Sequence, residues 1–270
     1  DVYKRQLLSG EQIYGLGFKF YLVDNTGNWF LPRDDPGINT ASIIKEIDAI
    51  LFEPVIALYP DPRPGEVGVG PEVVLSWTPG MYVQDVNGHD IYLGTDYESV
   101  RDANIAQPLG VLLKEGHDTN SINVGILELG QTYYWRVDEV NDVCEPYLWK
   151  GIVWSFTVIP GTAWDPDPAT GATAVAPDAI LSWKPGAYAD QHDVYLGTNF
   201  AAVTNATVDN PLGVYMGRQD ANSFDPGGLE LAQTYYWRID EANDVCAPYL
   251  WPGAVWSFTV ATCTGLENFE

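Results

Sequence analysis

Much of the sequence occurs twice, as two tandem copies. The run TYYWRVDEVNDVC at Thr132–Cys144 returns as TYYWRIDEANDVC at Thr234–Cys246, and LSWTPG, PLGV and YLWKGIVWSFTV return around it in the same order with few changes. The loop GMYVQDVNGHD of the first copy is shortened to GAYADQHD in the second, so the length difference falls in a loop. Each copy has about 100 residues, far more than one solenoid repeat of roughly 20 to 45 residues. We therefore expect two folded domains, each of which buries its own core.

Apolar residues alternate along the segments that the two copies share. VVLSW places Val73, Leu75 and Trp77 on one face, and YYWRV and VWSFTV alternate in the same way. This period of two predicts half-buried strands, with turns at the Gly- and Pro-containing stretches between them. DYESVRDAN at Asp96–Asn104 predicts one helical turn. The sequence therefore predicts an all-β protein made of tandem antiparallel β-sandwiches.

The run LELGQTYYWRVDEVN and its copy resemble a stretch of fibronectin type III domains that reads Leu-x-Pro-Gly-Thr-x-Tyr, followed by alternating Val and Ala-x-Asn. The chain departs from that pattern at Leu129 and Leu231, where Pro is usual. The resemblance implies a tyrosine corner at Tyr133 and Tyr235, whose hydroxyl binds backbone a few residues upstream. Together with the strand pattern it implies a structural core formed by Trp77, Trp183, Leu127, Leu229, Tyr133, Tyr235, Trp135, Trp237, Trp154 and Trp256.

The motifs DVYLGT, YYWRVDEVN and VWSFT also resemble repeats of large secreted multimodular proteins of planctomycete-type bacteria. In those proteins the repeats neighbour lectin-like jelly-roll modules. The expected organisation is a C-terminal piece of a jelly-roll, galactose-binding-like module at 7–56, fibronectin III-like modules at 57–159 and 160–261, and a linker with the start of a next module at 262–270. DVYKRQ at 1–6 is what a transposon adapter, GATGTGTATAAGAGACAG, encodes, so we interpret it as an artefact.

Two segments of the first 56 residues suggest particular elements. GLGFKFYLVDNTGNWFLP predicts a hairpin with a turn at Asp24–Gly27. IIKEIDAILFEP is open between a helical turn, with Ile43, Ile47 and Ile50 at helical spacing, and a strand at AILFEP.

The net charge of −24 limits the possible partners. Such a surface repels phosphate backbones and anionic lipid, so we expect no nucleic-acid partner, and no apolar run is long enough to span a membrane. The acidity favours solubility in an extracellular medium over weak calcium binding. DVNGHD at Asp85–Asp90 is the candidate calcium loop, but it lacks the frame of an EF-hand. We expect no cofactor and no metal.

Two carboxylates lie side by side in each copy, at Asp138 and Glu139 in the first. Neighbouring strand residues point to opposite faces, so this pair cannot flank one glycosidic bond, and we expect no catalytic residue. Glu139 and its equivalent Glu241 have inward parity and are expected at the rim, hydrogen-bonded or solvated. Arg136 and Asp138 share the outer face and are expected to form a surface pair of little energetic value. His89 and His192 are expected in hydrogen bonds at strand starts.

The cysteines and two tryptophans have open alternatives. Free or loop-packed thiols are favoured for Cys144, Cys246 and Cys263, and a Cys246–Cys263 disulfide is the alternative. Trp149 and Trp251, before the last strand of each copy, are either exposed platforms for a sugar ligand or covers of the sandwich end, and the latter is favoured.

The leading functional hypothesis is a non-catalytic spacer that presents flanking modules of an extracellular or cell-surface protein. The alternatives are a module that binds polysaccharide or a surface protein, and an accessory region of a secreted glycan-degrading enzyme whose catalytic domain lies elsewhere.

Overall fold

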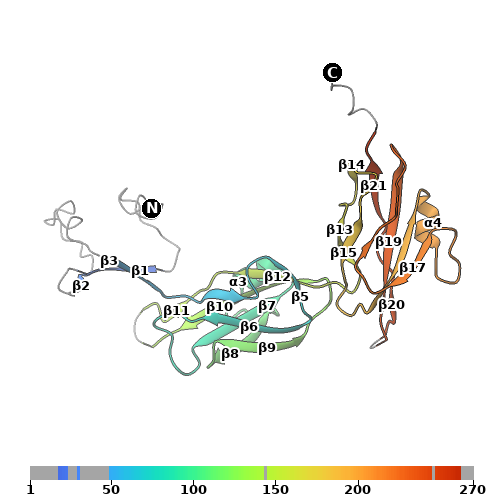
Figure 1. Ribbon diagram of the computed structural model, residues 1–270. Helices are drawn as coiled ribbons and strands as arrows, with labels where there is room; N and C mark the ends of the chain where they lie inside the picture. Colours follow the sequence, from blue (N-terminus) through green and yellow to red (C-terminus); the bar gives the residue numbers. More distant parts are fainter. Residues whose placement is uncertain (1–17, 24–28, 31–48, 143–144, 245–246, 263–270) are drawn as a thin grey trace, which may run out of the picture. The chain divides into compact units, whose positions relative to one another are not determined.

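The computed structural model describes residues 18–23, 29–30, 49–142, 145–244 and 247–262 (Figure 1). The described chain is almost entirely β, as predicted, and its two helices have six residues each. It divides into two compact units, the second of which contains residues 157–262.

A small antiparallel sheet precedes the copies. Strand β1 (Phe18–Val23) pairs with β2 (Trp29–Phe30) and with β3 (Ala49–Pro54). The predicted hairpin strands therefore pair, and AILFEP is a strand. The predicted turn at 24–27 and Ile43 and Ile47 lie outside the described residues.

The first copy consists of two sheets. One has the order β4-β6-β9, and the other has the order β5-β12-β10-β7-β8, with β11 paired to β10. Helix α3 (Tyr97–Asp102) lies between β7 and β8 in the chain. The strands are β4 (Leu58–Asp61), β5 (Glu66–Val69), β6 (Glu72–Thr78), β7 (His89–Gly94), β8 (Leu112–His117), β9 (Ser121–Ile126), β10 (Thr132–Val140), β11 (Leu148–Trp149) and β12 (Trp154–Val158).

The second copy repeats this topology. Its sheets have the orders β13-β15-β18 and β14-β21-β19-β16-β17, with β20 paired to β19. Helix α4 (Phe200–Asn205) follows β16. The strands are β13 (Trp164–Asp167), β14 (Ala172–Val175), β15 (Leu181–Lys184), β16 (Gln191–Gly197), β17 (Tyr215–Gln219), β18 (Ser223–Phe224), β19 (Thr234–Ala242), β20 (Leu250–Trp251) and β21 (Trp256–Val260).

A parallel pairing in the second copy differs from the antiparallel sheets that the sequence predicts. Strand β14 runs parallel to β21. The cause is a crossing between sheets: β13 pairs in the smaller sheet, and the chain then passes to the larger sheet at Gly171. Gly171 has φ +79°, a left-handed conformation that suits glycine. Strand β14 therefore pairs with β21, the last strand, and runs in the same direction.

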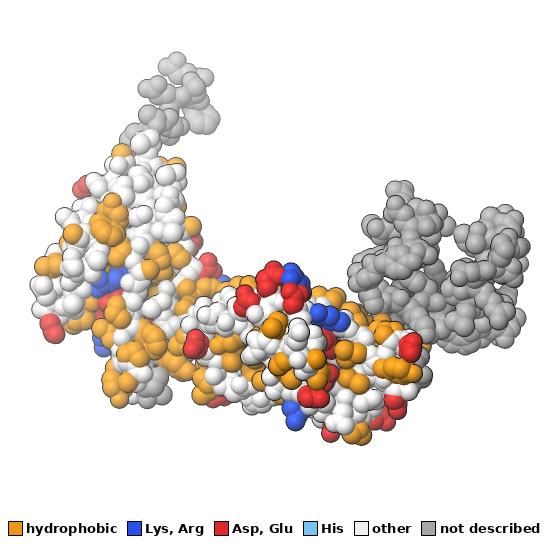
Figure 2. Space-filling view, turned by 180° about the vertical axis from the view of Figure 1, so that it is seen from behind, with side chains coloured by type: hydrophobic (Ala, Val, Ile, Leu, Met, Phe, Trp, Pro, Cys, Tyr) orange, Lys and Arg blue, Asp and Glu red, His pale blue; other side chains and the backbone are white. Residues whose placement is uncertain are grey.

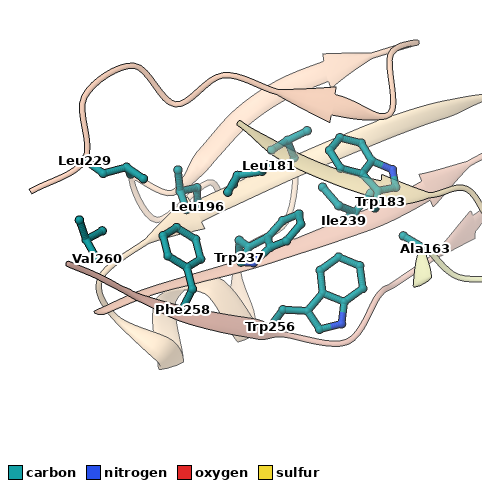
Figure 3. Packing of buried hydrophobic residues seen from close by; sticks show 11 residues of the cluster. Ala163, Leu181, Trp183, Leu196, Leu229, Trp237, Ile239, Trp256, Phe258 and Val260 are labelled. Atoms are coloured by element: carbon teal, nitrogen blue, oxygen red, sulfur yellow. The ribbon is translucent and has the colours of Figure 1, made fainter. Parts of the chain in front are cut away.

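The core of the second copy lies between its two sheets (Figure 3). Trp183 of the smaller sheet meets Trp237 edge to face at 6.2 Å between ring centroids, and Trp237 meets Trp256 at 4.7 Å. Tyr235 stacks on Phe258 at 5.7 Å, and its hydroxyl accepts a hydrogen bond of 3.1 Å from the Glu230 backbone N–H. This is the backbone contact expected of a tyrosine corner.

Most of the residues expected in the core are buried in the structure. Buried are Trp77, Trp135, Trp154, Trp183, Leu229, Trp237 and Trp256, and half-buried are Leu127, Tyr133 and Tyr235. The Trp77, Trp135 and Trp154 rings form the same chain as their counterparts, with centroid distances of 6.3 and 4.8 Å.

The two short helices begin at side-chain caps. Asp96 accepts a hydrogen bond from the Ser99 N–H, and Asn199 accepts one from the Ala202 N–H. The turn predicted at Asp96–Asn104 is thus α3, whereas α4 was not predicted.

Candidate functional site

The outer face of β10 carries an ion pair that is buried rather than exposed. Arg136 is 0% exposed and Asp138 is 2% exposed, so the prediction that this pair lies on the surface is wrong. The guanidinium holds the carboxylate with two hydrogen bonds, Nε to Oδ1 at 2.7 Å and Nη2 to Oδ2 at 2.9 Å. The alternation of residues along one strand does not reveal this burial, because the segment that covers the outer face comes from elsewhere in the chain.

The covering segment is α3 and the residues that follow it. Arg136 Nη1 donates to the carbonyls of Val100 and Arg101, and Nη2 donates to the Ala103 carbonyl at 2.8 Å. All five N–H groups of the guanidinium therefore have acceptors. These carbonyls end a short helix, so the cation also satisfies backbone groups that the helix leaves unpaired. The Tyr92 ring lies under the guanidinium, with 4.3 Å from Cζ to its centroid.

The second copy builds the same arrangement. Arg238 binds Asp240 at 2.7 and 2.9 Å and donates to the carbonyls of Val203, Thr204 and Ala206. Tyr195 takes the place of Tyr92, at 4.2 Å. We call each set, Arg136 with Asp138 and Arg238 with Asp240, the Arg–Asp clamp. Each clamp carboxylate also accepts a backbone N–H of the segment before the last strand, from Gly151 at 2.9 Å and from Gly253 at 3.0 Å.

The inward face at the same end of the strand carries a His–Glu pair. His89 Nδ1 lies 2.9 Å from Glu139 Oε2, and both side chains are buried. That contact lacks hydrogen-bond geometry in the first copy. In the second copy His192 and Glu241 are hydrogen-bonded, and Glu241 also accepts from the Gly186 N–H at 3.1 Å. His89 is the first residue of β7. Of the two alternatives for the glutamates, the hydrogen-bonded one is confirmed and the solvated one is wrong, because both are fully buried and each accepts a backbone N–H. The Trp77 ring lies against His89 and the Trp183 ring against His192, with 5.1 and 5.3 Å between ring centroids, and these rings exclude water there.

Burial changes the proton affinity of the clamp carboxylates. Loss of hydration raises the pKa of Asp138 and of Asp240, and the neighbouring arginines partly oppose that rise. Asp90, which faces Asp138 across the strands, has its pKa raised chiefly by burial as well. The Gly116 N–H, 2.9 Å from Asp90 Oδ1, opposes the rise.

The two copies differ at the carboxylate next to the clamp. Asp193, the equivalent of Asp90, is held by Arg218 at 2.9 and 2.7 Å and by the Tyr215 hydroxyl at 2.8 Å. Burial and this hydrogen bond raise the pKa of Tyr215 to about 12. The first copy has Glu115 where the second has Arg218, so its Asp90 is without an arginine partner of that kind. The same fold therefore tolerates two different charge arrangements at this position.

The duplicated polar residues thus act on the fold itself. Asp138 and Glu139 point to opposite faces of the strand, as predicted from parity, and each accepts a backbone N–H of its own copy, from Gly151 and from Gly80. A general acid or nucleophile needs access to a substrate atom at hydrogen-bonding distance. Both clamp arginines use every donor internally, so neither has one left for a ligand.

The remaining candidates are dispersed. Asp85 is exposed, whereas Asp90 is buried against Gly116, and within the described ranges no three His, Cys, Asp or Glu residues are placed to hold a metal ion. All three cysteines lie outside the described residues, as does any disulfide between them.

In the part of the chain that the structure describes, no helix is long and apolar enough to cross a membrane. Acidic side chains are spread over the face in Figure 2 with hydrophobic ones between them.

Trp149 and Trp251 are half-buried, so their exposure fits neither alternative fully. Trp251 lies so close to Gly161 that a Cβ there would be 2.5 Å from the ring, which places one ring face on backbone. The ring centroids of Trp149 and Tyr82 are 6.1 Å apart. The more exposed aromatics are Tyr147 and Tyr249, two residues earlier, which sequence reasoning missed. Their signal is the repeated PYLW, in which the Tyr shares strand parity with the Trp but comes before the strand begins.

Comparison with known proteins gave no match to a protein-family model and no match among curated proteins.

Proposed function

We propose that this chain is a non-catalytic spacer in an extracellular or cell-surface multimodular protein, in which two fibronectin III-like modules present flanking modules. Each copy has a core between two sheets, and the resemblance described above supports the assignment of the modules. On this proposal the flanking modules of the same protein are the principal partners.

The buried clamp is the observation that carries the proposal. The polar residues written in both copies are those that a duplicated active site would need, namely Arg, Asp, Glu and His. In each copy the Arg and Asp are bonded to one another and to local backbone instead, and the His and Glu are buried in contact with each other. Groups used in this way add to the rigidity of each module, which is what a spacer needs.

Single-molecule force extension of the chain, flanked by marker domains, tests the proposal. Two unfolding events are expected, each releasing a contour length of about 35 nm, because each copy has about 100 residues and an extended chain spans roughly 3.3 to 3.6 Å per residue. A chain that extends at low force without two such events would not hold modules at a fixed separation and would overturn the spacer role.

Binding of a polysaccharide is the second candidate, and the partial exposure of Trp149 and Trp251 favours it over a protein partner. Aromatic rings with one free face stack on sugar rings. Replacing both tryptophans with alanine tests this version, since a chain that binds sugar through these rings loses that binding. Unchanged binding would place the ligand elsewhere.

A further inference from the structure

A groove of about 560 Å³ opens at one end of the larger sheet of the second copy. Its polar lining comes from β16 and the residue before it, from β17, and from the end of β19 with the residues that follow. These residues are Asp190, Gln191, Arg218, Asn243 and Asp244. Its apolar lining includes Tyr249, Leu250 and Val208. The volume lies in the range of small-molecule sites, roughly 300 to 1,000 Å³.

The apolar wall is formed by exposed side chains. Tyr249 is 62% exposed, and Leu250 and Val208 are exposed as well. Asn243 binds the backbone beside Tyr249 twice, because its Nδ2 donates to the Pro248 carbonyl at 3.0 Å and its backbone N–H donates to the Tyr249 carbonyl at 3.0 Å. The backbone at Pro248 and Tyr249 is thus held by hydrogen bonds, which lowers the entropy lost when a ligand binds to the tyrosine ring.

The polar wall keeps hydrogen-bonding groups for a ligand. Arg218 is 43% exposed and uses Nε and Nη2 for Asp193, so its other N–H groups remain. Gln191 donates Nε2 to Asp220 at 2.8 Å, which leaves its carbonyl oxygen as an acceptor. Asp190 and Asp244 are exposed carboxylates. Donors and acceptors therefore lie opposite an aromatic ring.

The first copy departs from the second at this place. Its longer loop brings Asn87 against β8, where a Cβ at Gly116 would lie 2.9 Å from the Asn87 Oδ1, and the Asn87 N–H donates to Asp118 at 2.7 Å. Glu115 stands where the second copy has Arg218. Shortening the loop by three residues thus frees the corresponding strand end in the second copy, and the arginine supplies donors there.

The charge of the groove selects the class of ligand. Arg218 is neutralised by Asp193, and Asp190, Asp220 and Asp244 leave an excess of negative charge around it. Anionic ligands are repelled. A ligand with an apolar face for the tyrosine and hydroxyl groups for the amide, carboxylates and guanidinium satisfies both walls. We propose that the groove of the second copy binds a unit of a neutral saccharide chain, a role that goes beyond the spacer function and does not depend on it.

Calorimetric titration of the full 270-residue chain with neutral hexasaccharides of glucose, xylose, mannose, galactose and N-acetylglucosamine tests the proposal. At least one of these probes is expected to bind, and Tyr249→Ala is expected to weaken that binding at least tenfold. The matched control is Tyr147→Ala in the first copy, which is 56% exposed and is expected to bind as the unaltered chain does. Thermal melts of both variants check that each remains folded.

A second variant, Asp190→Asn with Gln191→Gly, gives the groove the residues found in the first copy and is expected to weaken binding without altering Tyr249. The proposal is overturned if none of the hexasaccharides binds at millimolar concentration, or if Tyr249→Ala and Tyr147→Ala have equal effects. Binding of spermine alone would also overturn it, because the groove would then be a site for cations. None of these results alters the two force-extension events on which the spacer role depends.

Discussion

Replacing Arg136 with alanine removes the centre of the clamp in the first copy. The change leaves the Asp138 carboxylate, 2% exposed, without its cation. It also leaves the carbonyls of Val100, Arg101 and Ala103 without a donor. Breaking a buried ion pair by removing one partner costs about 3 to 5 kcal/mol. Water that enters the space left by the side chain offsets part of the loss at the carbonyls, so we expect a decrease of about 4 kcal/mol in the free energy of unfolding of this copy.

Pulse proteolysis across a urea series, with the fragments identified by mass spectrometry, measures the unfolding of each copy separately. Arg136→Ala is expected to shift the transition of the first copy alone, and Arg238→Ala that of the second copy alone, by a similar amount. Arg136→Met combined with Asp138→Asn is expected to recover much of the loss, because no unpaired charge then stays buried. A loss below about 1 kcal/mol, as for exposed pairs, would refute the reasoning.

Three further outcomes are expected from single replacements. Burial raises the pKa of Asp90, so the protonated carboxyl stabilises the folded state fully below the unfolded pKa of 3.8, and that contribution is lost as pH rises through the folded pKa. Thermal unfolding at pH 8 should therefore show that Asp90→Asn stabilises the protein. Asp193→Asn should destabilise it, because the change weakens the contact with Arg218. Effects of the same sign would contradict the different charge environments assigned to Asp90 and Asp193. Ala232 has φ +61° and its equivalent Gly130 has φ +72°, a left-handed conformation that costs energy for any residue with a Cβ. Ala232→Gly should therefore stabilise the second copy by about 1 kcal/mol, and Gly130→Ala should destabilise the first copy by a similar amount. Urea unfolding measures both changes. Glu139→Gln should lower the free energy of unfolding by about 1 to 3 kcal/mol in the same assay, because it weakens the buried contact with His89, and no change would mean that the contact does not form.

The fold class and strand parity could be predicted because they depend on local patterns. Alternation in VVLSW and VWSFTV is visible in the sequence, and a buried face requires it. Parity also separates Asp138 from Glu139 without knowledge of the neighbouring segments. The parallel pairing of β14 with β21 could not be predicted, because it depends on a crossing between sheets that the alternation of one strand does not encode.

The burial of the outer face was missed for a related reason. Arg136 and Asp138 occupy positions that are exposed in an uncovered sheet, and a segment more than thirty residues earlier covers them. Six-residue helices give too short a pattern to show which face they pack against. The repetition of Arg and Asp two residues apart, in a chain with few basic residues, is the signal that could have indicated the clamp.

Amide hydrogen exchange at Gly151 and Gly253, followed by NMR, tests most directly whether the duplicated carboxylates belong to the scaffold. These N–H groups donate to Asp138 and Asp240 at 2.9 and 3.0 Å. If the carboxylates are buried parts of the scaffold, both amides exchange only when their copy unfolds, with the free energy of global unfolding. Exchange at both glycines within seconds, in a chain whose core strands remain protected, would show that the carboxylates lie in an open, hydrated site and would contradict the account.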